Sequence, residues 1–198
     1  MITPAKRKHL LKLVYSLLIL TLVPATSWGQ QPSSAEAKTL TEKLVLDYLD
    51  KMADLYTFEK PDIDKLLTYA REHISENAKF SIENHVNELV DPVFEKYNYE
   101  QIIKKTEENY VKAYNTQTKY KMESLSVSET GTTAEVKYHV WMSTAYASEE
   151  PKTGRKAEIR VKTYSLCTEQ VEINETILKV LESNCVQDII IAKPVFLE

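Results

Sequence analysis

His85 and Tyr138 are the two side chains that the sequence best places for acid–base chemistry. An imidazole titrates near neutral pH and can act as a general base, and a tyrosine hydroxyl can donate a hydrogen bond to a ligand carbonyl. A general base also needs a partner and a substrate within hydrogen-bond reach, and a strand tyrosine is often an aromatic core residue. The sequence therefore offers both as candidates and assigns neither a catalytic role.

Tyr138 lies on a strand predicted over 133–146, where one face is more apolar than the other. Successive side chains of a strand point to opposite faces, so even and odd positions separate. The even face, which is expected to point inward, consists of Val136, Tyr138, Val140 and Met142. The odd face consists of Glu135, Lys137, His139 and Trp141.

The sequence contains no recognisable motif for a metal, a phosphate group or an activated nucleophile. His73, His85 and His139 are too far apart in sequence for the short spacings that bind zinc, and His73, on the second predicted helix, is expected at the surface. The glycines are too few and too separated for a phosphate-binding loop, and no GxSxG turn occurs. We therefore expect no metal and no cofactor.

Cys167 and Cys185 are the only cysteines, and their spacing fits a β-hairpin. Their midpoint is residue 176, next to a predicted turn beginning at Asn174, so the two would face each other across the strands. Neither belongs to a CxxC pair, which disfavours a redox or nucleophilic thiol. A structural disulfide is expected, with a stabilisation of about 3 kcal/mol from loop closure.

The first 29 residues have the pattern of a secretory signal peptide. Lys6, Arg7 and Lys8 precede an apolar run over 10–23, and Ser27 and Gly29 supply small residues before a cleavage site. The run is shorter than the roughly 20 residues that a spanning helix needs. We expect export to the periplasm or the extracellular space, with no stable membrane insertion after cleavage.

The charge of the processed chain argues against nucleic acid as a partner. Residues 1–29 carry four basic and no acidic side chains, so their removal changes the formal net charge from -4 to -8. Nucleic acids bind clustered Lys and Arg, and this chain would be repelled. After a polar leader over 30–35, the remaining length suits one domain over 36–192, followed by a tail over 193–198.

Hydrophobic periodicity predicts helices first and strands afterwards. Apolar residues recur three and four apart over 35–56, 61–75 and 99–116, with Pro61 at a helix start and Asn98 as a cap. Strands are predicted over 78–86, 120–128, 133–146, 155–173 and 177–192. Gly131 lies in a turn that needs a positive φ. The segment over 86–97, which contains Pro92, is expected to be a loop or an irregular helix.

This order of elements resembles the nuclear transport factor 2-like superfamily, which includes the SnoaL-like cyclases and the ketosteroid isomerases. The resemblance rests on LDYLDKMADLYTFEKPDIDKLLTYA followed by KFSIENHV, and on YEQIIKKTEENYVKAY followed by YKMESLSVSETGTTAEVKYHVWM. It implies an α+β fold in which the helices pack on a strongly curved antiparallel sheet and leave a cone-shaped pocket. Ketosteroid isomerases use an aspartate base, whereas the predicted strands contain only Asp188 near their end.

Three functions fit this fold. The first is non-catalytic binding of a small apolar molecule or a protein partner, with the pocket lined by Tyr48, Tyr56, Tyr110, Tyr114, Tyr138, Val140, Met142 and Tyr164. The second is an assembly subunit of the envelope or a secretion system, a possible homodimer, that oligomerises through the sheet face or the edge over 120–128. The third is an isomerase, cyclase or dehydratase using His85 and Tyr138, which requires both side chains to reach one cavity.

Overall fold

The computed structural model describes residues 34–87, 89–149, 154–174 and 176–196. The predicted signal peptide and residues 30–33 of the polar leader lie outside these residues. The chain from Ser34 onward forms one compact unit. None of the helices in the described ranges is long and apolar enough to cross a membrane.

The described ranges contain three helices, and two of them begin at side-chain caps. Helix α2 spans Ser34–Leu55, α3 spans Ile63–His73 and α4 spans Tyr99–Tyr110. The Asp62 side chain accepts a hydrogen bond from the Lys65 backbone, and Asn98 forms a reciprocal capping box at the start of α4. The third helix was predicted to reach residue 116 and instead ends at Tyr110. Pairing of Thr116 with Phe58 draws the chain beyond it into a strand.

The strands form one curled sheet. Their bounds are β1 Ile74–Val86, β2 Val93–Asn98, β3 Ala113–Val127, β4 Thr133–Glu149, β5 Lys156–Asn174, β6 Ile177–Ile191 and β7 Val195–Phe196. The order is β2-β1-β6-β5-β4-β3, and β7 pairs with the start of β5.

Three details of the sheet differ from the sequence-based expectation. The sheet is mixed rather than antiparallel, because β1 runs parallel to β6. The segment over 86–97, expected to be a loop or an irregular helix, contains the strand β2, which pairs with β1. Most side chains of β2 are exposed, so its sequence lacks the apolar alternation by which a strand is recognised. The tail over 193–198 contains the short strand β7.

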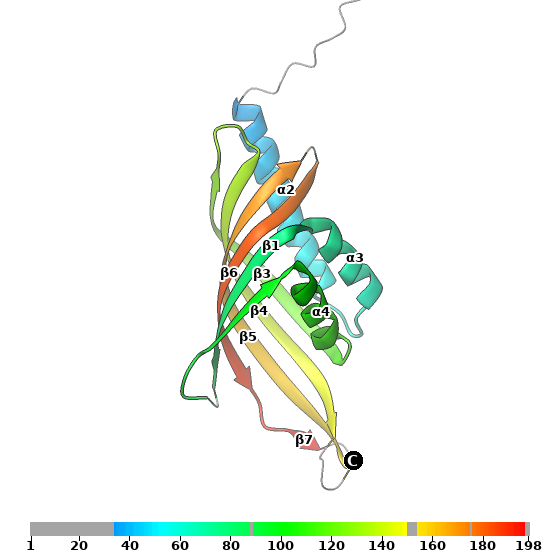
Figure 1. Ribbon diagram of the computed structural model, residues 1–198. Helices are drawn as coiled ribbons and strands as arrows, with labels where there is room; N and C mark the ends of the chain where they lie inside the picture. The colour runs from blue at the N-terminus through cyan, green and yellow to red at the C-terminus, as the bar shows by residue number, and fades with distance from the viewer. Residues whose placement is uncertain (1–33, 88, 150–153, 175, 197–198) are drawn as a thin grey trace, which may run out of the picture. The chain divides into compact units, whose positions relative to one another are not determined.

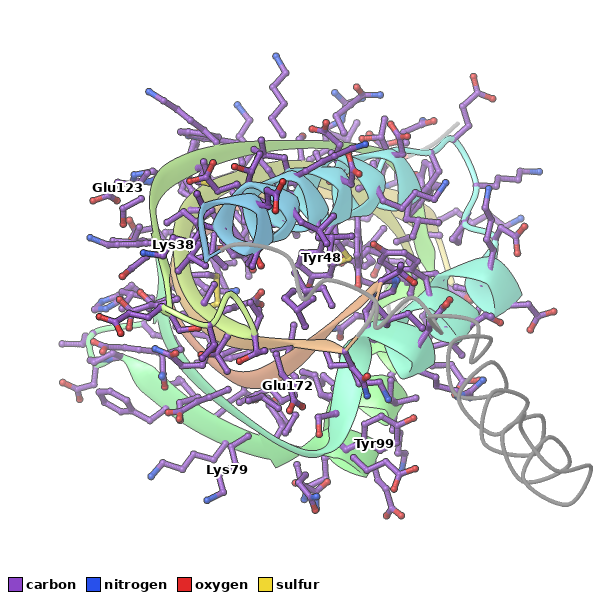
Figure 2. The ribbon with its side chains drawn as sticks, turned by 90° about the horizontal axis from the view of Figure 1, so that it is seen from above. Lys38, Tyr48, Lys79, Tyr99, Glu123 and Glu172 are labelled. Carbon is purple, nitrogen blue, oxygen red and sulfur yellow. A yellow bond between two sulfur atoms is a disulfide. The ribbon has the colours of Figure 1, made fainter. Side chains whose placement is uncertain are left out.

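The sheet curls around α2, and α3 and α4 lie on the same side of the sheet (Figure 1). Seen along the curl, Tyr48 of α2 lies inside it, whereas Glu123 and Lys79 project outward (Figure 2). The core joins apolar residues of α2 to the inner side chains of the sheet: Val45, Tyr48, Leu49, Val136, Val171, Leu178 and Val180. Burial of this one face fixes the register of the strands.

Gly131 fixes the β3–β4 turn against the start of α2. Its φ is +72°, as the predicted turn requires, and a Cβ atom there would lie 2.7 Å from the Cβ of Ala37. The Thr41 hydroxyl donates a hydrogen bond to the Gly131 carbonyl. Only glycine permits both this backbone conformation and this close approach.

The predicted disulfide joins Cys167 of β5 to Cys185 of β6, with a Cα–Cα distance of 4.1 Å. The two residues are direct cross-strand partners, which confirms the predicted pairing. Nearer the turn, Asn174 pairs with Ile177, so the pairing there is shifted by one residue relative to the pairing of the cysteines. The shift occurs between Gln170 and Val171. A bulge therefore lies between the turn and the cysteines.

Candidate functional site

A large cavity lies between the inner face of the sheet and helices α2 and α4. This outer cavity has a volume of about 540 Å³, within the usual range for small-molecule sites. Its apolar and aromatic lining includes Met52, Tyr56, Ile82, Ile102, Tyr110, Tyr120, Tyr138, Val140, Met142, Tyr146, Val161 and Ile189. Cys167 of the disulfide also lines it, so the cross-link faces the interior.

One side of the outer cavity carries a polar cluster centred on Glu95 of β2. The Asn84 side chain donates to Glu95 Oε2 at 2.9 Å, and Lys105 Nζ donates to Glu95 Oε1 at 3.4 Å. Lys105 also lies over the Tyr97 ring, 5.7 Å from its centroid. The hydrogen bond from Tyr97 and the Lys105 charge hold the Glu95 pKa below its usual value. The cluster therefore presents a balanced ion pair to the cavity.

A second, smaller cavity adjoins the first and is called the inner cavity below. It has a volume of about 150 Å³, and it shares Met52, Tyr56, Ile82, Ile102 and Thr106 with the outer cavity. Helices α2 and α3 cover it, and its remaining lining includes Tyr48, Leu66, Tyr69, His73, Phe80, Glu169, Val180, Ser183 and Cys185.

Glu169 of β5 is the buried carboxyl group of the inner cavity. It is 5 % exposed, and Ser183 Oγ donates to its Oε1 at 3.1 Å. Burial raises the Glu169 pKa to about 7, although contacts with the Tyr138, Ser183 and Tyr48 hydroxyls favour the charged form. Its Oε2 atom has no hydrogen-bond partner among the described residues. Near neutral pH the group is thus both a donor and an acceptor of protons.

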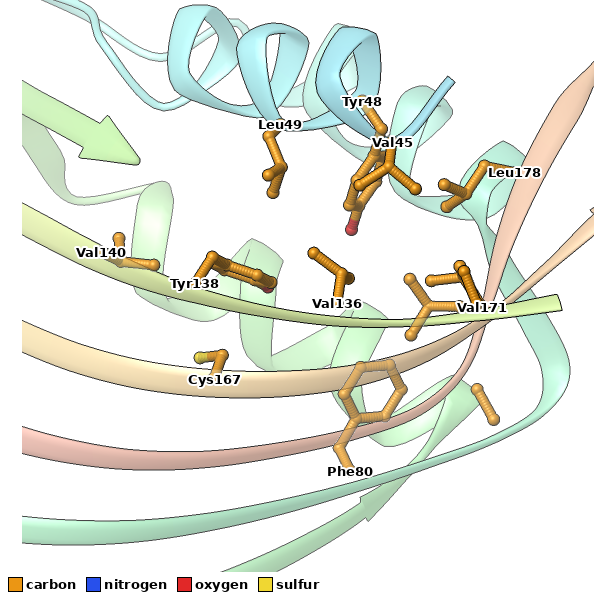
Figure 3. Packing of buried hydrophobic residues seen from close by; sticks show 13 residues of the cluster. Val45, Tyr48, Leu49, Phe80, Val136, Tyr138, Val140, Cys167, Val171 and Leu178 are labelled. Atoms are coloured by element: carbon orange, nitrogen blue, oxygen red, sulfur yellow. The ribbon is translucent and has the colours of Figure 1, made fainter. Parts of the chain in front are cut away.

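Tyrosine hydroxyls surround this carboxyl group. Tyr48 extends from α2 toward the sheet, and Tyr138 extends from β4 into the same interior (Figure 3). The rings of Tyr120 and Tyr138 lie 5.6 Å apart. Burial raises the pKa values of Tyr48, Tyr120 and Tyr138 well above the usual value, and the charge of Glu169 raises them further. These phenols stay neutral and serve as hydrogen-bond donors.

Most of the residues predicted to line a pocket do face the interior. Tyr56, Tyr110, Tyr138, Val140 and Met142 line the outer cavity, and Tyr48 and Tyr56 line the inner cavity. His139 and Trp141, on the odd positions of β4, stack on each other outside the curl.

Tyr164 and His85 are not brought to the cavities. Tyr164 lies between Thr163 and Ser165, which line the outer cavity, so it points to the other face and is 41 % exposed. His85 lies between Asn84 and Val86 in the same way, and its Nε2 contacts Glu83 Oε1 at 2.9 Å. Because His85 and Tyr138 point to opposite sides of the sheet, they cannot act together on one ligand.

Tyr114 and His73 also differ from expectation. Tyr114 belongs to β3 rather than to a helix, does not line either cavity, and donates a hydrogen bond to Glu158 Oε2 at 2.8 Å. His73 was expected at the surface, yet it lines the inner cavity and donates from Nδ1 to the Leu178 carbonyl at 2.9 Å. Its ring packs against that of Tyr69 at a tilt, with centroids 4.0 Å apart. The end of α3 packs directly on β6.

Glu169 is the residue that sequence reasoning missed. The signal was available, because Glu169 lies two positions from Cys167 and must share its face of β5. Because Cys167 and Cys185 were expected to face each other across two strands of the sheet, the alternation of side chains along the strand would have placed the Glu169 carboxyl group on the same face, beside the disulfide. No cluster of three or more His, Cys, Asp or Glu that could hold a metal occurs within the described part of the chain.

Comparisons with known proteins support the fold. No protein-family model matches this sequence. No curated protein matches it either. A protein of Kribbella flavida is similar in structure, with a TM-score of 0.50 and 8% identity over 79% of this chain and 94% of that one.

Two further solved structures have lower TM-scores. One is described as a putative scytalone dehydratase from Novosphingobium aromaticivorans, with a TM-score of 0.45 and 14% identity over 81% of this chain and 87% of that one. The other is a nuclear transport factor 2-like protein of unknown function from Shewanella baltica, with a TM-score of 0.42 and 13% identity over 75% of this chain and 94% of that one. At these identities the likeness concerns the fold alone. Within the described residues, three helices pack on a curled, unclosed, mixed sheet, an arrangement similar to the cone fold of nuclear transport factor 2-like proteins.

Proposed function

We propose that this protein binds a small, partly apolar molecule inside the curled sheet and does not transform it. The observation that carries the proposal is the outer cavity of about 540 Å³, walled by apolar and tyrosine side chains. The polar part of the lining includes the cluster of Glu95, Lys105 and Asn84, together with Thr106, Asn109, Thr163, Ser165 and Gln187. Such a lining, mostly apolar with a few fixed polar groups, is typical of small-molecule sites.

Export is part of the same proposal. The disulfide between Cys167 and Cys185 is compatible with an oxidising compartment. The amino-terminal sequence pattern gives an independent reason to expect secretion. A ligand carrier of this kind would meet its ligand in the periplasm or outside the cell.

The test uses a cavity-blocking substitution and a matched control on the outer face. Val140 lines the outer cavity, and Val186 is 47 % exposed on β6. Native mass spectrometry of protein from its own host reports any retained ligand, and an apolar fluorescent probe, 8-anilinonaphthalene-1-sulfonate, reports the cavity directly. We expect Val140→Trp to abolish probe binding and ligand retention, and Val186→Trp to leave both unchanged. Equal probe binding by the wild type and both variants would overturn the proposal.

Proton transfer is a second candidate, and Glu169 is the observation that favours it. A carboxyl group with a pKa of about 7 is populated in both forms near neutral pH, as a general acid or base requires. The test follows deuterium uptake by cyclohexanone in D2O by NMR. Binding without catalysis predicts the same exchange rate with the wild type and Glu169→Gln. A wild-type rate well above that of the variant would favour the enzyme instead.

A further inference from the structure

We propose that the inner cavity binds the ammonium head of a small organic cation, with the Glu169 carboxylate as counter-ion and tyrosine rings as walls. The inference rests on the proposed ligand binding and names the class of ligand that this part of the site selects. Two observations carry it: a buried carboxyl oxygen that has no hydrogen-bond partner and no ion-pair partner among the described residues, and an aromatic lining.

The first observation is the electrostatic state of Glu169. None of the described Lys, Arg or His side chains forms an ion pair with it, and Ser183 Oγ donates a hydrogen bond to its Oε1 at 3.1 Å. The buried Oε2 atom has no hydrogen-bond partner among the residues that the structure describes. Buried carboxyl groups normally have a cationic or hydrogen-bonding partner, so this atom is open to a ligand group that carries positive charge or a proton.

The second observation is the aromatic wall. Tyr48 and Tyr69 stack with ring centroids 6.3 Å apart, and the His73 ring packs against Tyr69 at a tilt. Tyr56 closes the wall on the side that is shared with the outer cavity. Aromatic faces attract cations, most strongly where water is excluded. A carboxylate beside several rings is therefore suited to an ammonium group.

Other classes of ligand fit less well. An anion would lie against the carboxyl group of Glu169. A divalent metal ion needs several oxygen, nitrogen or sulfur ligands at close range, and the described residues hold no such cluster. The inner cavity, at about 150 Å³, is large enough for a compact head group, and the adjoining outer cavity can take an apolar tail.

The titratable groups facing Glu169 set the pH dependence. They are Tyr48 from α2, Tyr56 just after α2, Tyr69 and His73 from α3, Tyr120 from β3 and Tyr138 from β4. The tyrosines remain neutral at physiological pH because burial raises their pKa values. A cation that binds below about pH 7 must displace the proton of Glu169. Its affinity should therefore rise with pH and level off above 7.

The experiment compares choline with its neutral carbon isostere, 3,3-dimethylbutan-1-ol. Saturation-transfer NMR and calorimetry measure both affinities for the full chain at about pH 6 and about pH 8. We expect choline to bind more tightly than the isostere at the higher pH. We also expect choline affinity to fall about tenfold at the lower pH, with the isostere unaffected.

Two variants assign the effect. Glu169→Gln keeps the shape of the side chain and should abolish both the preference for choline and its pH dependence, while circular dichroism verifies the fold. Glu135→Gln, at an exposed position of β4 outside the curl, should retain both, because the ionised group in the cavity is Glu169. A preference that survives Glu169→Gln would overturn the inference.

The outcomes separate this inference from the proposed function. If choline and the isostere bind equally and Val140→Trp still abolishes binding of the fluorescent probe, the proposed cation site is wrong and the proposed ligand binding stands. Absence of binding by choline, the isostere and the fluorescent probe overturns both.

Discussion

Glu169 and Glu123 show how the two faces of one sheet treat the same chemical group. Glu169 lies inside the curl, is buried and has no ion-pair partner among the described residues. Glu123 lies outside, where Lys137 Nζ approaches within 2.9 Å and His139 Nε2 within 3.1 Å (Figure 2). The Glu169 pKa is raised by burial, whereas the Glu123 pKa is lowered, first by the Lys137 hydrogen bond. The exposed Glu123 carboxylate is thus neutralised by basic neighbours, whereas the buried Glu169 has no such neighbour among the described residues.

The two faces also differ in how they pack aromatic residues of a single strand, and substitutions there are expected to give the largest change in the free energy of unfolding. Tyr138 and Trp141 both belong to β4, but Tyr138 is 4 % exposed and Trp141 is 37 % exposed. Tyr138→Ala should lower the free energy of unfolding by about 3–5 kcal/mol, because it leaves a cavity in the core. Trp141→Ala should lower it by about 1 kcal/mol or less.

Urea denaturation of both variants measures this difference. Tyr138→Phe is the matched control, since it keeps the ring and removes only the hydroxyl. Similar losses in the Tyr138→Ala and Trp141→Ala variants would mean that the two faces are equally packed and would break the comparison.

The second prediction concerns the pH dependence of stability. The Glu169 pKa is about 7 in the folded state and near 4.5 when unfolded, so the folded state binds the extra proton between these values. Stability is therefore lost as pH rises through this window. Glu169→Gln removes the penalty and should stabilise the protein by about 3 kcal/mol above pH 7, with almost no effect below pH 4.5.

Differential scanning calorimetry of the wild type and the Glu169→Gln variant at several pH values measures this gain. The Glu135→Gln variant, at an exposed position of β4, serves as the control for loss of a carboxylate. A gain in stability that is the same at every pH would contradict the raised pKa of Glu169.

The alternation of side chains along single strands predicted which residues face the interior. The parallel strand pairing and the position of His73, which sequence reasoning missed, depend on contacts between segments that are distant in the sequence. The even positions of β4 and the pairing of Cys167 with Cys185 follow from strand periodicity and a hairpin turn, which are properties of neighbouring residues. The parallel pairing of β1 with β6 joins segments that are about 100 residues apart, so it cannot be predicted from the pattern of neighbouring residues in either strand. His73 was misplaced for the same reason, because its partner Leu178 lies on a distant strand.

The third prediction separates packing from chain entropy. The disulfide faces the interior, but its stabilisation acts mainly on the unfolded chain. Replacing both Cys167 and Cys185 by Ala should lower the free energy of unfolding by about 3 kcal/mol. It should also steepen the dependence on urea, because the unfolded chain expands. Tyr138→Ala, which acts on the folded state, should leave that slope unchanged.

The smallest effect is expected for Glu123→Gln, with a sign opposite to that of Glu169→Gln. The lowered Glu123 pKa means that its stabilisation is present above the unfolded pKa and is lost as pH falls through the folded pKa. The variant should be slightly less stable than the wild type at neutral pH and equal to it in acid. Salt at about 1 M should remove the difference, since exposed ion pairs are screened. Urea midpoints at both pH values measure the effect. A stabilising Glu123→Gln would mean that both faces penalise a carboxylate, and the distinction between them would then rest on packing alone.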